Sequence, residues 1–324
     1  MLRRRTLLRG LSLAPLFHAP CARAQSYPAR PIRFVVGSSP GGAMDATGRS
    51  MAPKLSTLLG QSVVVDNRSG GGGALSLEAV AHSAPDGHTM LLSNMSTMVV
   101  NPIIQPNPPF RPAEVLAPVS LAVDVSTVLV VPAGRPWRSV GELLSAAREK
   151  ANGLSWGHSG VGATNHLSGA LLDSVAGIQT VAVPYRGGGP LSLDLIGGRL
   201  DYAFATVPSV LSAIRSGQLR ALAVPMPRRS RLMPEVPTVA ESGLPGYEVL
   251  NWYGLLVHRA TPRPIVERLA TVARETLEDP GTVALLERQG LEPLPNTPEE
   301  FADFLVRERR KWEPVVRAAD MRTD

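Results

Sequence analysis

Five loops rich in glycine and hydroxyl-bearing residues are the parts of this sequence whose composition and spacing suit ligand binding. Each follows an apolar, strand-like run and leads into a helix-like segment. Helix N-termini offer unpaired backbone N–H groups and the positive end of the helix dipole, so anions bind there readily. Glycine lets the backbone approach a ligand closely, and hydroxyl groups can donate hydrogen bonds to it. The loops are Ser38-Ser39-Pro40-Gly41-Gly42, Ser93 to Thr97, His158 to Thr164, Arg186-Gly187-Gly188-Gly189 and Thr206-Val207-Pro208-Ser209.

Two interpretations of these loops stay open. Glycine and serine at a helix start are ordinary turn and cap residues, so any single loop can be explained without a ligand. Because loops from both halves of the chain share the composition, the set as a whole favours an anion site between two domains. The glycine run from Gly70 to Gly73 lacks the lysine of a phosphate-binding loop and does not fit G-x-G-x-x-G, which argues against nucleotide binding.

Catalytic and metal chemistry find little support in the sequence. The stretch from Gly157 to Val161 misses the nucleophile-elbow pattern because it ends in valine instead of glycine. The histidines show no metal-ligand spacing; His158 and His166, eight residues apart across a loop, could contact a ligand or stabilise the loop. Asp45 could be a binding group or a favourable charge at a helix start. We therefore expect no catalytic residue, no metal site and no cofactor.

The elements that must position these loops alternate between strand and helix patterns, which predicts an α/β protein with largely parallel sheets. The proline-rich segment 101–118 is expected to be an irregular connection. The loops then lie at the carboxyl ends of strands, where ligands bind in open α/β sheets. Strands are expected at 32–36, 63–65, 89–92, 154–157, 180–184, 200–205 and 219–224, and helices at 44–59, 75–83, 140–151, 164–175, from 190 and 208–216, with three more at the C-terminal end.

Two extended segments predict that the chain crosses twice between domains. Residues 119–131 are almost uninterruptedly apolar and β-branched, and residues 225–257 are turn-rich and then extended. A chain that leaves one domain, builds a second and returns suits a hinged, clam-like protein. We predict that domain 1 comprises residues 25–125 plus 226–324 and that domain 2 comprises residues 126–225.

Residues 1–24 are typical of a signal peptide. An arginine cluster precedes a short apolar run, and Ala22-Arg23-Ala24 fits the A-x-A rule for cleavage after Ala24. Residues 4–9 also resemble a twin-arginine signal, so the Sec and twin-arginine routes both stay open. The alternative interpretation of residues 1–24 is an amphipathic N-terminal helix of a cytosolic protein. We expect export to the periplasm.

Removal of this leader, residues 1–24, changes both the net charge and the cysteine content of the chain. The leader holds five arginines and no acidic residue, so its loss lowers the net charge from +6 to +1. A near-neutral chain without a basic run gives no electrostatic support for nucleic-acid binding. The only cysteine, Cys21, also lies in the leader, which leaves the mature chain without a disulfide or a cysteine-ligated metal.

Nine stretches, in order and at consistent spacing, resemble the periplasmic solute receptors of the tripartite tricarboxylate transporter system, often called Bug receptors. They are YPARPIRFVV (27–36), PGGAMDATGR (40–49), LGQSVVVDNRSGGGG (59–73), APDGHTMLLS (84–93), HSGVGATNHLSG (158–169), VPYRGGGPLSLDLIGGRLD (183–201), LRALAV (219–224), PEVPTVAESGLPGYE (234–248) and GTVALLERQGLEP (281–293). The resemblance implies a type II periplasmic-binding-protein-like fold: two α/β domains around a ligand cleft, with two interdomain crossings. It also implies no catalysis and a carboxylate held by backbone amides, hydroxyl groups and bridging waters.

The resemblance also implies which residues bind the ligand. Carried onto this chain, they are Ser39, Pro40, Gly41, Gly42, Asp45, Ser96, Thr97, Ser159, Gly162, Ala163, Thr164, His166, Arg186 and Thr206. Two departures concern the specificity side of the cleft. Ser38 and Ser39 stand where the family usually has an aromatic residue or proline, and Ala205 and Thr206 stand where it usually has an acidic or amide pair. For that reason we transfer no particular ligand.

The predicted function is that of a periplasmic receptor. It captures a small organic mono- or dicarboxylate and presents it to the membrane components of a tripartite tricarboxylate transporter. We expect a monomer that binds no nucleic acid. Two alternatives stay open: an orphan sensory receptor of the same fold that signals carboxylate availability, and an exported hydrolase or lyase, which would need a nucleophile–base pair or a metal site.

Overall fold

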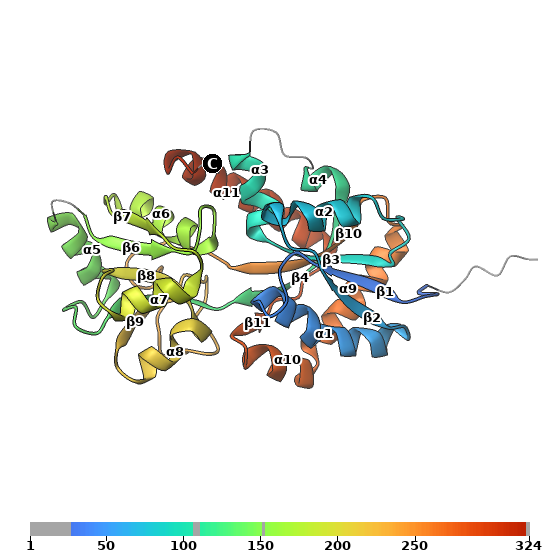
Figure 1. The fold of residues 1–324 in the computed structure, drawn as a ribbon, viewed down its shortest axis with the longest axis horizontal. Helices are drawn as coiled ribbons and strands as arrows, with labels where there is room; N and C mark the ends of the chain where they lie inside the picture. The colour runs from blue at the N-terminus through green and yellow to red at the C-terminus, as the bar shows by residue number, and fades with distance from the viewer. Residues whose placement is uncertain (1–26, 106–110, 151–152, 322–324) are drawn as a thin grey trace, which may run out of the picture.

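The computed structural model describes residues 27–105, 111–150 and 153–321, and it divides into two lobes that each contain one β-sheet (Figure 1). The predicted leader, residues 1–24, lies outside the described residues. Both lobes are mixtures of helix and strand, as the sequence predicts.

The first sheet, in the right-hand lobe of Figure 1, has the strand order β11-β4-β10-β3-β1-β2. Its parallel strands are β1 (Ile32–Val36), β2 (Val63–Asn67) and β3 (Thr89–Asn94). Its antiparallel strands are β4 (Leu116–Val125), β10 (Trp252–His258) and β11 (Leu291–Pro293). Its longer helices are α1 (Ala43–Leu59), α2 (Ala74–Ala81), α9 (Arg263–Glu278) and α10 (Pro280–Glu287), and its shorter helical segments are η1 (Gly71–Gly73), η2 (Ser96–Val100), α3 (Asn101–Ile104) and α4 (Pro112–Val115).

The second sheet, in the left-hand lobe, has the order β7-β6-β8-β5-β9. Strand β6 runs parallel to β7 and β8, whereas β5 runs antiparallel to β8 and β9. The strands are β5 (Thr127–Pro132), β6 (Ser155–His158), β7 (Val181–Pro184), β8 (Tyr202–Thr206) and β9 (Leu219–Ala223), and the helices are α5 (Val140–Glu149), α6 (Thr164–Ala176), α7 (Gly188–Ile196) and α8 (Val207–Arg215).

Two crossings join the lobes, as the predicted fold class requires. The first is the single residue Ser126, since β4 ends at Val125 in one sheet and β5 begins at Thr127 in the other. The second is the segment 224–251, which leads from β9 back to β10. The last helix, α11 (Pro298–Ala318), packs against β4 of the first lobe and α6 of the second.

One apolar cluster runs through both lobes. It includes Leu91 of the first sheet, Trp156 and Phe204 of the second and Trp312 of α11, all buried. Tyr247, in the second crossing, is 1% exposed and donates a hydrogen bond from its hydroxyl to the Ser168 carbonyl oxygen at 2.7 Å. Burial of this apolar surface is the main force that holds the lobes together on this side.

The sheets are mixed, so the prediction of largely parallel sheets is wrong. Among the described strands, four pairings are parallel and five are antiparallel. Strand–helix–strand units give the parallel pairs, because a parallel neighbour needs a crossover connection. The crossing strands β4, β5 and β10 enter their sheets without such a unit and pair antiparallel.

Two connections are more regular than the sequence predicts. Ser93 and Asn94 belong to β3 and Ser96 begins η2, where we expected a loop. In the predicted irregular connection, α3 and α4 form and β4 begins; residues 106–110 lie outside the described part. Pro102 and Pro112 lie in the first turns of these helices, where the missing N–H breaks no hydrogen bond. The other predicted elements are confirmed within a few residues, but the short β11 was missed.

Candidate functional site

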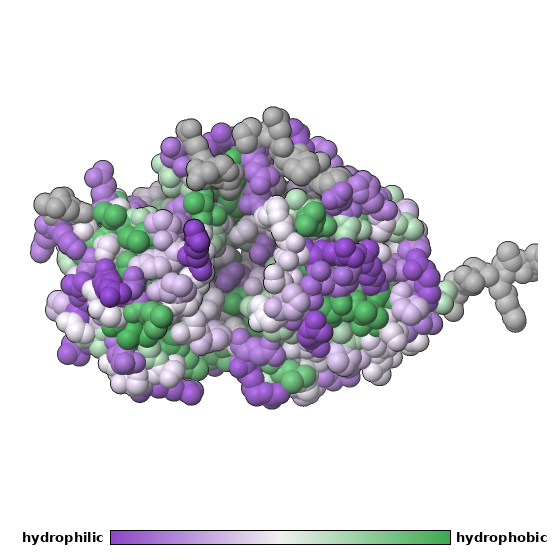
Figure 2. All heavy atoms as spheres, in the orientation of Figure 1, coloured by the Kyte–Doolittle hydropathy of each residue, from purple (hydrophilic) through white to green (hydrophobic). Residues whose placement is uncertain are grey.

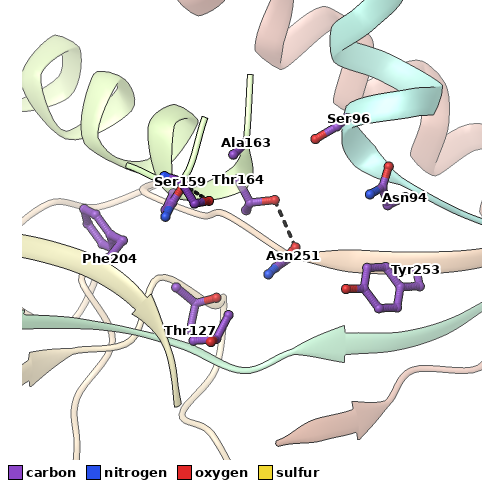
Figure 3. A pocket seen from close by; sticks show the side chains of 11 residues that line it. Asn94, Ser96, Thr127, Ser159, Ala163, Thr164, Phe204, Asn251 and Tyr253 are labelled. Atoms are coloured by element: carbon purple, nitrogen blue, oxygen red, sulfur yellow. Dashed lines mark hydrogen bonds between the residues drawn. The ribbon is translucent and has the colours of Figure 1, made fainter. Parts of the chain in front are cut away.

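A cavity of about 180 Å³ lies between the two lobes. Figure 2 shows a hollow in the surface where the lobes meet, and Figure 3 shows the cavity residues from close by. None of the lining side chains is acidic or basic. They are Asn94, Ser96, Thr127, Ser159, Ala163, Thr164, Asn165, Phe204, Thr206, Asn251 and Tyr253.

Two helices begin at the cavity wall. Ala163 precedes α6 and Thr206 precedes α8, and neither helix has a side-chain hydrogen bond capping its first turn. The first backbone N–H groups of a helix have no partner within it, and the helix dipole places partial positive charge there. In α8, however, the Val207 N–H donates to the Ser126 carbonyl oxygen at 2.8 Å and Pro208 has no N–H. The start of α6 therefore makes the wall of the second lobe suited to an anion, although this wall carries no basic side chain.

Two hydrogen bonds cross from one lobe to the other beside the cavity. The Thr164 hydroxyl donates to Asn251 Oδ1 at 2.9 Å, as the dashed line in Figure 3 shows, and the Ser96 hydroxyl donates to the Gly162 carbonyl oxygen at 3.0 Å. Gly162 has a φ of 72°, a left-handed conformation that favours glycine. A Cβ at that position would lie 3.0 Å from Val100 Cγ1, so glycine also permits the close approach of the two lobes.

The two histidines of the 158–166 loop stack on each other behind the cavity. Their ring centroids are 3.9 Å apart with an interplanar angle of 11°. The Gly162 N–H donates to His166 Nδ1 at 3.3 Å, and His158 Nδ1 donates to the Gly160 carbonyl oxygen at 2.9 Å. Burial lowers the pKa of His158, and burial together with the neighbouring His158 lowers the pKa of His166 to about 4. At neutral pH the pair is uncharged and braces the loop.

Asp45 is occupied by protein partners. Its carboxylate accepts hydrogen bonds from the Gly41 N–H at 2.9 Å, from Arg49 Nε at 3.0 Å and from Asn67 Nδ2 at 3.0 Å. The hydrogen bond from Arg49 is the largest cause that lowers the pKa of Asp45, followed by those from Gly41 and Asn67. Asp45 thus anchors the 38–42 loop, which does not line the cavity.

A buried carboxyl pair lies at the crossings, next to the cavity. Asp124 and Glu292 pair across β4 and β11, and they are 2% and 1% exposed. Asp124 Oδ1 accepts from the Asn251 N–H at 2.6 Å, while Glu292 Oε1 accepts from the Ser126 hydroxyl at 2.8 Å. Burial raises the pKa of Asp124 to about 7, with the negative charge of Glu292 adding to the rise. The carboxyl groups hold backbone and hydroxyl groups of both crossings.

The structure brings five of the predicted ligand residues to the cavity: Ser96, Ser159, Ala163, Thr164 and Thr206. Four others support that wall or a neighbouring loop: Thr97 donates to the Gly72 carbonyl oxygen, Gly162 and His166 bond to each other, and Asp45 anchors Gly41. The remaining predicted residues, Ser39, Pro40, Gly41, Gly42 and Arg186, are exposed and do not line the cavity.

Six lining residues were missed by sequence reasoning. Asn94 lies inside a loop that the sequence did single out, and Asn165 directly follows another, so both could have been included. Thr127, Asn251 and Tyr253 lie on or next to the crossing strands, and Phe204 lies inside β8. The signal for Asn251 was a lone amide in the otherwise apolar run Val249 to Tyr253.

Two further observations concern the described residues alone. No helix within 27–105, 111–150 and 153–321 is long and apolar enough to cross a membrane. In the same ranges, no three histidine, cysteine, aspartate or glutamate side chains gather in a way that could hold a metal ion.

Comparison with known proteins identifies the family. A family model described as the tripartite tricarboxylate transporter family receptor matches residues 47–321. The chain belongs to this receptor family. Among its relatives is BugT of Bordetella pertussis, which is 35% identical over 309 residues that cover 95% of each protein.

Solved structures of related receptors agree with the fold. R. palustris Rpa4515, solved with adipate, is 32% identical with a TM-score of 0.77, and the match covers 91% of this chain and 99% of that one. MatC of Rhodopseudomonas palustris, solved with bound malate, is 30% identical with a TM-score of 0.72, covering 90% of this chain and 100% of that one. The predicted family and the predicted fold of a two-domain periplasmic binding protein are therefore confirmed, and the chain is a solute-binding receptor of this transporter family.

Proposed function

We propose that this receptor closes its two lobes on a small organic mono- or dicarboxylate in the periplasm and presents it to the membrane components of a tripartite tricarboxylate transporter. The observation that carries the proposal is the cavity between the lobes, whose uncharged polar wall includes the uncapped N-terminus of α6. Such a wall stabilises an anion through N–H groups and hydroxyls without a basic residue. The adipate and malate of the two related structures are ligands of this chemical class.

The size and polarity of the cavity support a small ligand of moderate affinity. A volume of about 180 Å³ is below the range of roughly 300–1,000 Å³ usual for drug-sized ligands. Each charge-assisted hydrogen bond contributes about 1.5–3 kcal/mol. Three or four of them, less the cost of ordering, correspond to a Kd of about 1 μM.

The proposal includes the predicted ligand residues, in two roles. Ser96, Ser159, Ala163, Thr164 and Thr206 would contact the ligand directly. Thr97, Gly162, His166 and Asp45 would hold the contacting segments in place. Ser39 to Gly42 and Arg186 lie outside the cavity in this conformation, and a contact with the ligand would require further movement of their loops.

Several further points belong to the same proposal. The chain would be exported with residues 1–24 cleaved after Ala24, would act as a monomer and would perform no catalysis. The placement of β4 and β5 in different sheets on either side of Ser126 supports a domain boundary at 125/126, and the end of β9 at Ala223 supports a second boundary at 225/226. Turnover of a carboxylate ester by the purified protein would contradict the proposal of a receptor without catalysis.

The proposed site is tested by titrating the purified mature protein with a carboxylate panel in a calorimeter. We expect Ser159→Ala and Thr164→Ala to weaken the tightest ligand roughly tenfold each, since each removes a hydroxyl that lines the cavity and holds an asparagine. Ser216→Ala, an equivalent change at the exposed far end of α8, serves as the control. Unchanged affinity in both cleft variants would contradict the site.

A further inference from the structure

Three asparagines of the cavity have their carbonyl oxygens occupied by the protein. Asn94 Oδ1 accepts from the Thr97 N–H at 3.0 Å. Asn165 Oδ1 accepts from the Ser159 N–H at 3.2 Å and from the Ser159 hydroxyl at 3.1 Å. Asn251 Oδ1 accepts from the Thr164 hydroxyl at 2.9 Å. Within the described part of the chain, none of the three Nδ2 groups bonds to another protein group.

The orientation of two of these amides follows from their partners. A backbone N–H can only donate, so the atom that it meets on Asn94 and on Asn165 must be the oxygen. The amide NH₂ of each side chain is then the group left without a protein partner. Asn251 meets a hydroxyl group, which leaves its NH₂ in the same situation when that hydroxyl donates.

The remaining polar groups of the cavity are neutral. The hydroxyls of Ser96 and Thr127 donate to the carbonyl oxygens of Gly162 and Val125, and that of Thr206 donates to the Ser209 hydroxyl. The oxygen atoms of these groups can still accept a hydrogen bond from a ligand hydroxyl. No carboxylate lines the cavity, and Asp124 is buried behind Asn251, where it binds the backbone N–H of that residue.

These donors and acceptors distinguish ligands by the charges that the ligands carry. A carboxylate finds fixed amide donors for its oxygens, and a hydroxyl on the ligand finds neutral acceptors. An ammonium group finds no negative partner, and placing an unpaired charge in a closed cavity is costly.

We propose that Asn94, Asn165 and Asn251 determine ligand specificity. Their amide NH₂ groups bind ligand carboxylate oxygens. The cavity selects carboxylates that carry a hydrogen or a hydroxyl group over those that carry an ammonium group at the same position. The inference rests on the proposed function. Asn165 belongs to the second lobe, whereas Asn94 and Asn251 lie at strands of the first, so full recognition requires both lobes.

Matched ligand sets test the selection. Each set keeps one carbon skeleton and changes one substituent: succinate, L-malate and L-aspartate; glutarate, L-2-hydroxyglutarate and L-glutamate; propanoate, L-lactate and L-alanine. Calorimetry is expected to show that the amino acid of each bound set binds at least tenfold more weakly than its hydroxy or unsubstituted match. An amino acid that binds as tightly as its matches would overturn the inference and leave the receptor function standing, whereas no binding by any member would contradict both.

Two nearly isosteric variants test the asparagines. Asn94→Asp and Asn165→Asp keep the oxygen that accepts from the protein and replace the free NH₂ by a negatively charged oxygen. We expect each to weaken the tightest ligand at least tenfold and to reduce the preference against the matching amino acid. A purely structural role of these asparagines would leave the ratio of the two ligand affinities unchanged, so a change in this ratio distinguishes the two roles.

The control is Asn296→Asp. Asn296 Oδ1 likewise accepts from a backbone N–H, that of Leu121, at 2.7 Å, and the residue does not line the cavity. This variant adds the same charge with the same local bond retained, so affinity and ligand ratio are expected to match those of the unchanged protein. Loss of affinity in the control equal to that in the cleft variants, or none in either cleft variant, would overturn the role of the asparagines.

Discussion

At the scale of single residues, Asp124 is a buried carboxyl group that holds the backbone of Asn251 while facing Glu292 across the strands. Arg228 is the positive charge that acts on it. Because burial raises its folded pKa from 3.8 to about 7, the folded state binds a proton more tightly than the unfolded state. The contribution of the Asp124 carboxyl group to the stability of the fold is therefore fully present below pH 3.8 and is lost as the pH rises from there to about 7.

Asp124→Asn should remove this contribution to the pH dependence. The asparagine oxygen can still accept from the Asn251 N–H, and no charge is buried at high pH. The variant's free energy of unfolding minus that of the unchanged protein should be larger at pH 8 than at pH 5 by on the order of 2 kcal/mol. Urea denaturation at both pH values measures this difference. The same difference in the free energy of unfolding at both pH values would show that Asp124 ionises normally in the folded protein.

The candidate site shows how far single residues can be predicted from sequence. Ser159, Thr164 and their neighbours were predicted because a glycine- and hydroxyl-rich loop before a helix is a local pattern. Asn251 and Tyr253 could not be predicted in that way, since the fold alone brings a crossing strand to the cavity. Asp45 shows the opposite difficulty: its type and position suit an anion site, yet Arg49 and Asn67 occupy it.

At the scale of elements, the 158–166 loop depends on two neutral histidines. His166 must remain unprotonated at Nδ1 to accept from Gly162, and a charge on either ring would repel a charge on the other. A histidine with a lowered folded pKa costs stability when it is protonated, so stability should fall as the pH drops from 6.5 to about 4.

His166→Asn isolates this effect, because the asparagine oxygen can accept from the Gly162 N–H but does not titrate. The unchanged protein should lose on the order of 2 kcal/mol more than the variant between pH 7 and pH 4. Chemical denaturation across this range gives the difference curve, in which the effects of titrating groups outside the His158–His166 pair cancel. A flat curve would contradict a buried, neutral His166.

Helices and strands were predictable where their patterns are local. The helix α1 ends at Leu59, as predicted, because the next residue, Gly60, adopts the left-handed conformation with a φ of 69°. The direction of a strand in its sheet is not a local property, which explains why β4, β5 and β10 were not foreseen as antiparallel. Nor did the three-residue β11 have a pattern of its own, although it pairs with β4 beside the hinge.

At the scale of the whole molecule, the two crossings, the carboxyl pair beside them and α11 all lie where the lobes join. One side of the junction is a continuous apolar cluster, and the other holds a small polar cavity. A ligand in that cavity, as proposed above, would touch both lobes and would therefore stabilise the arrangement in which Thr164 meets Asn251. The near-neutral charge of the chain without residues 1–24 fits a site that uses backbone and amide dipoles in place of basic residues.

A crystal structure of the mature protein with the tightest carboxylate of the panel tests this account most directly. The account predicts the ligand between the lobes, with carboxylate oxygens about 2.7–3.2 Å from amide nitrogens of Asn94, Asn165 or Asn251 and from N–H groups at the start of α6. A ligand bound outside this cavity, or one whose carboxylate is held by a basic side chain such as Arg186, would contradict it.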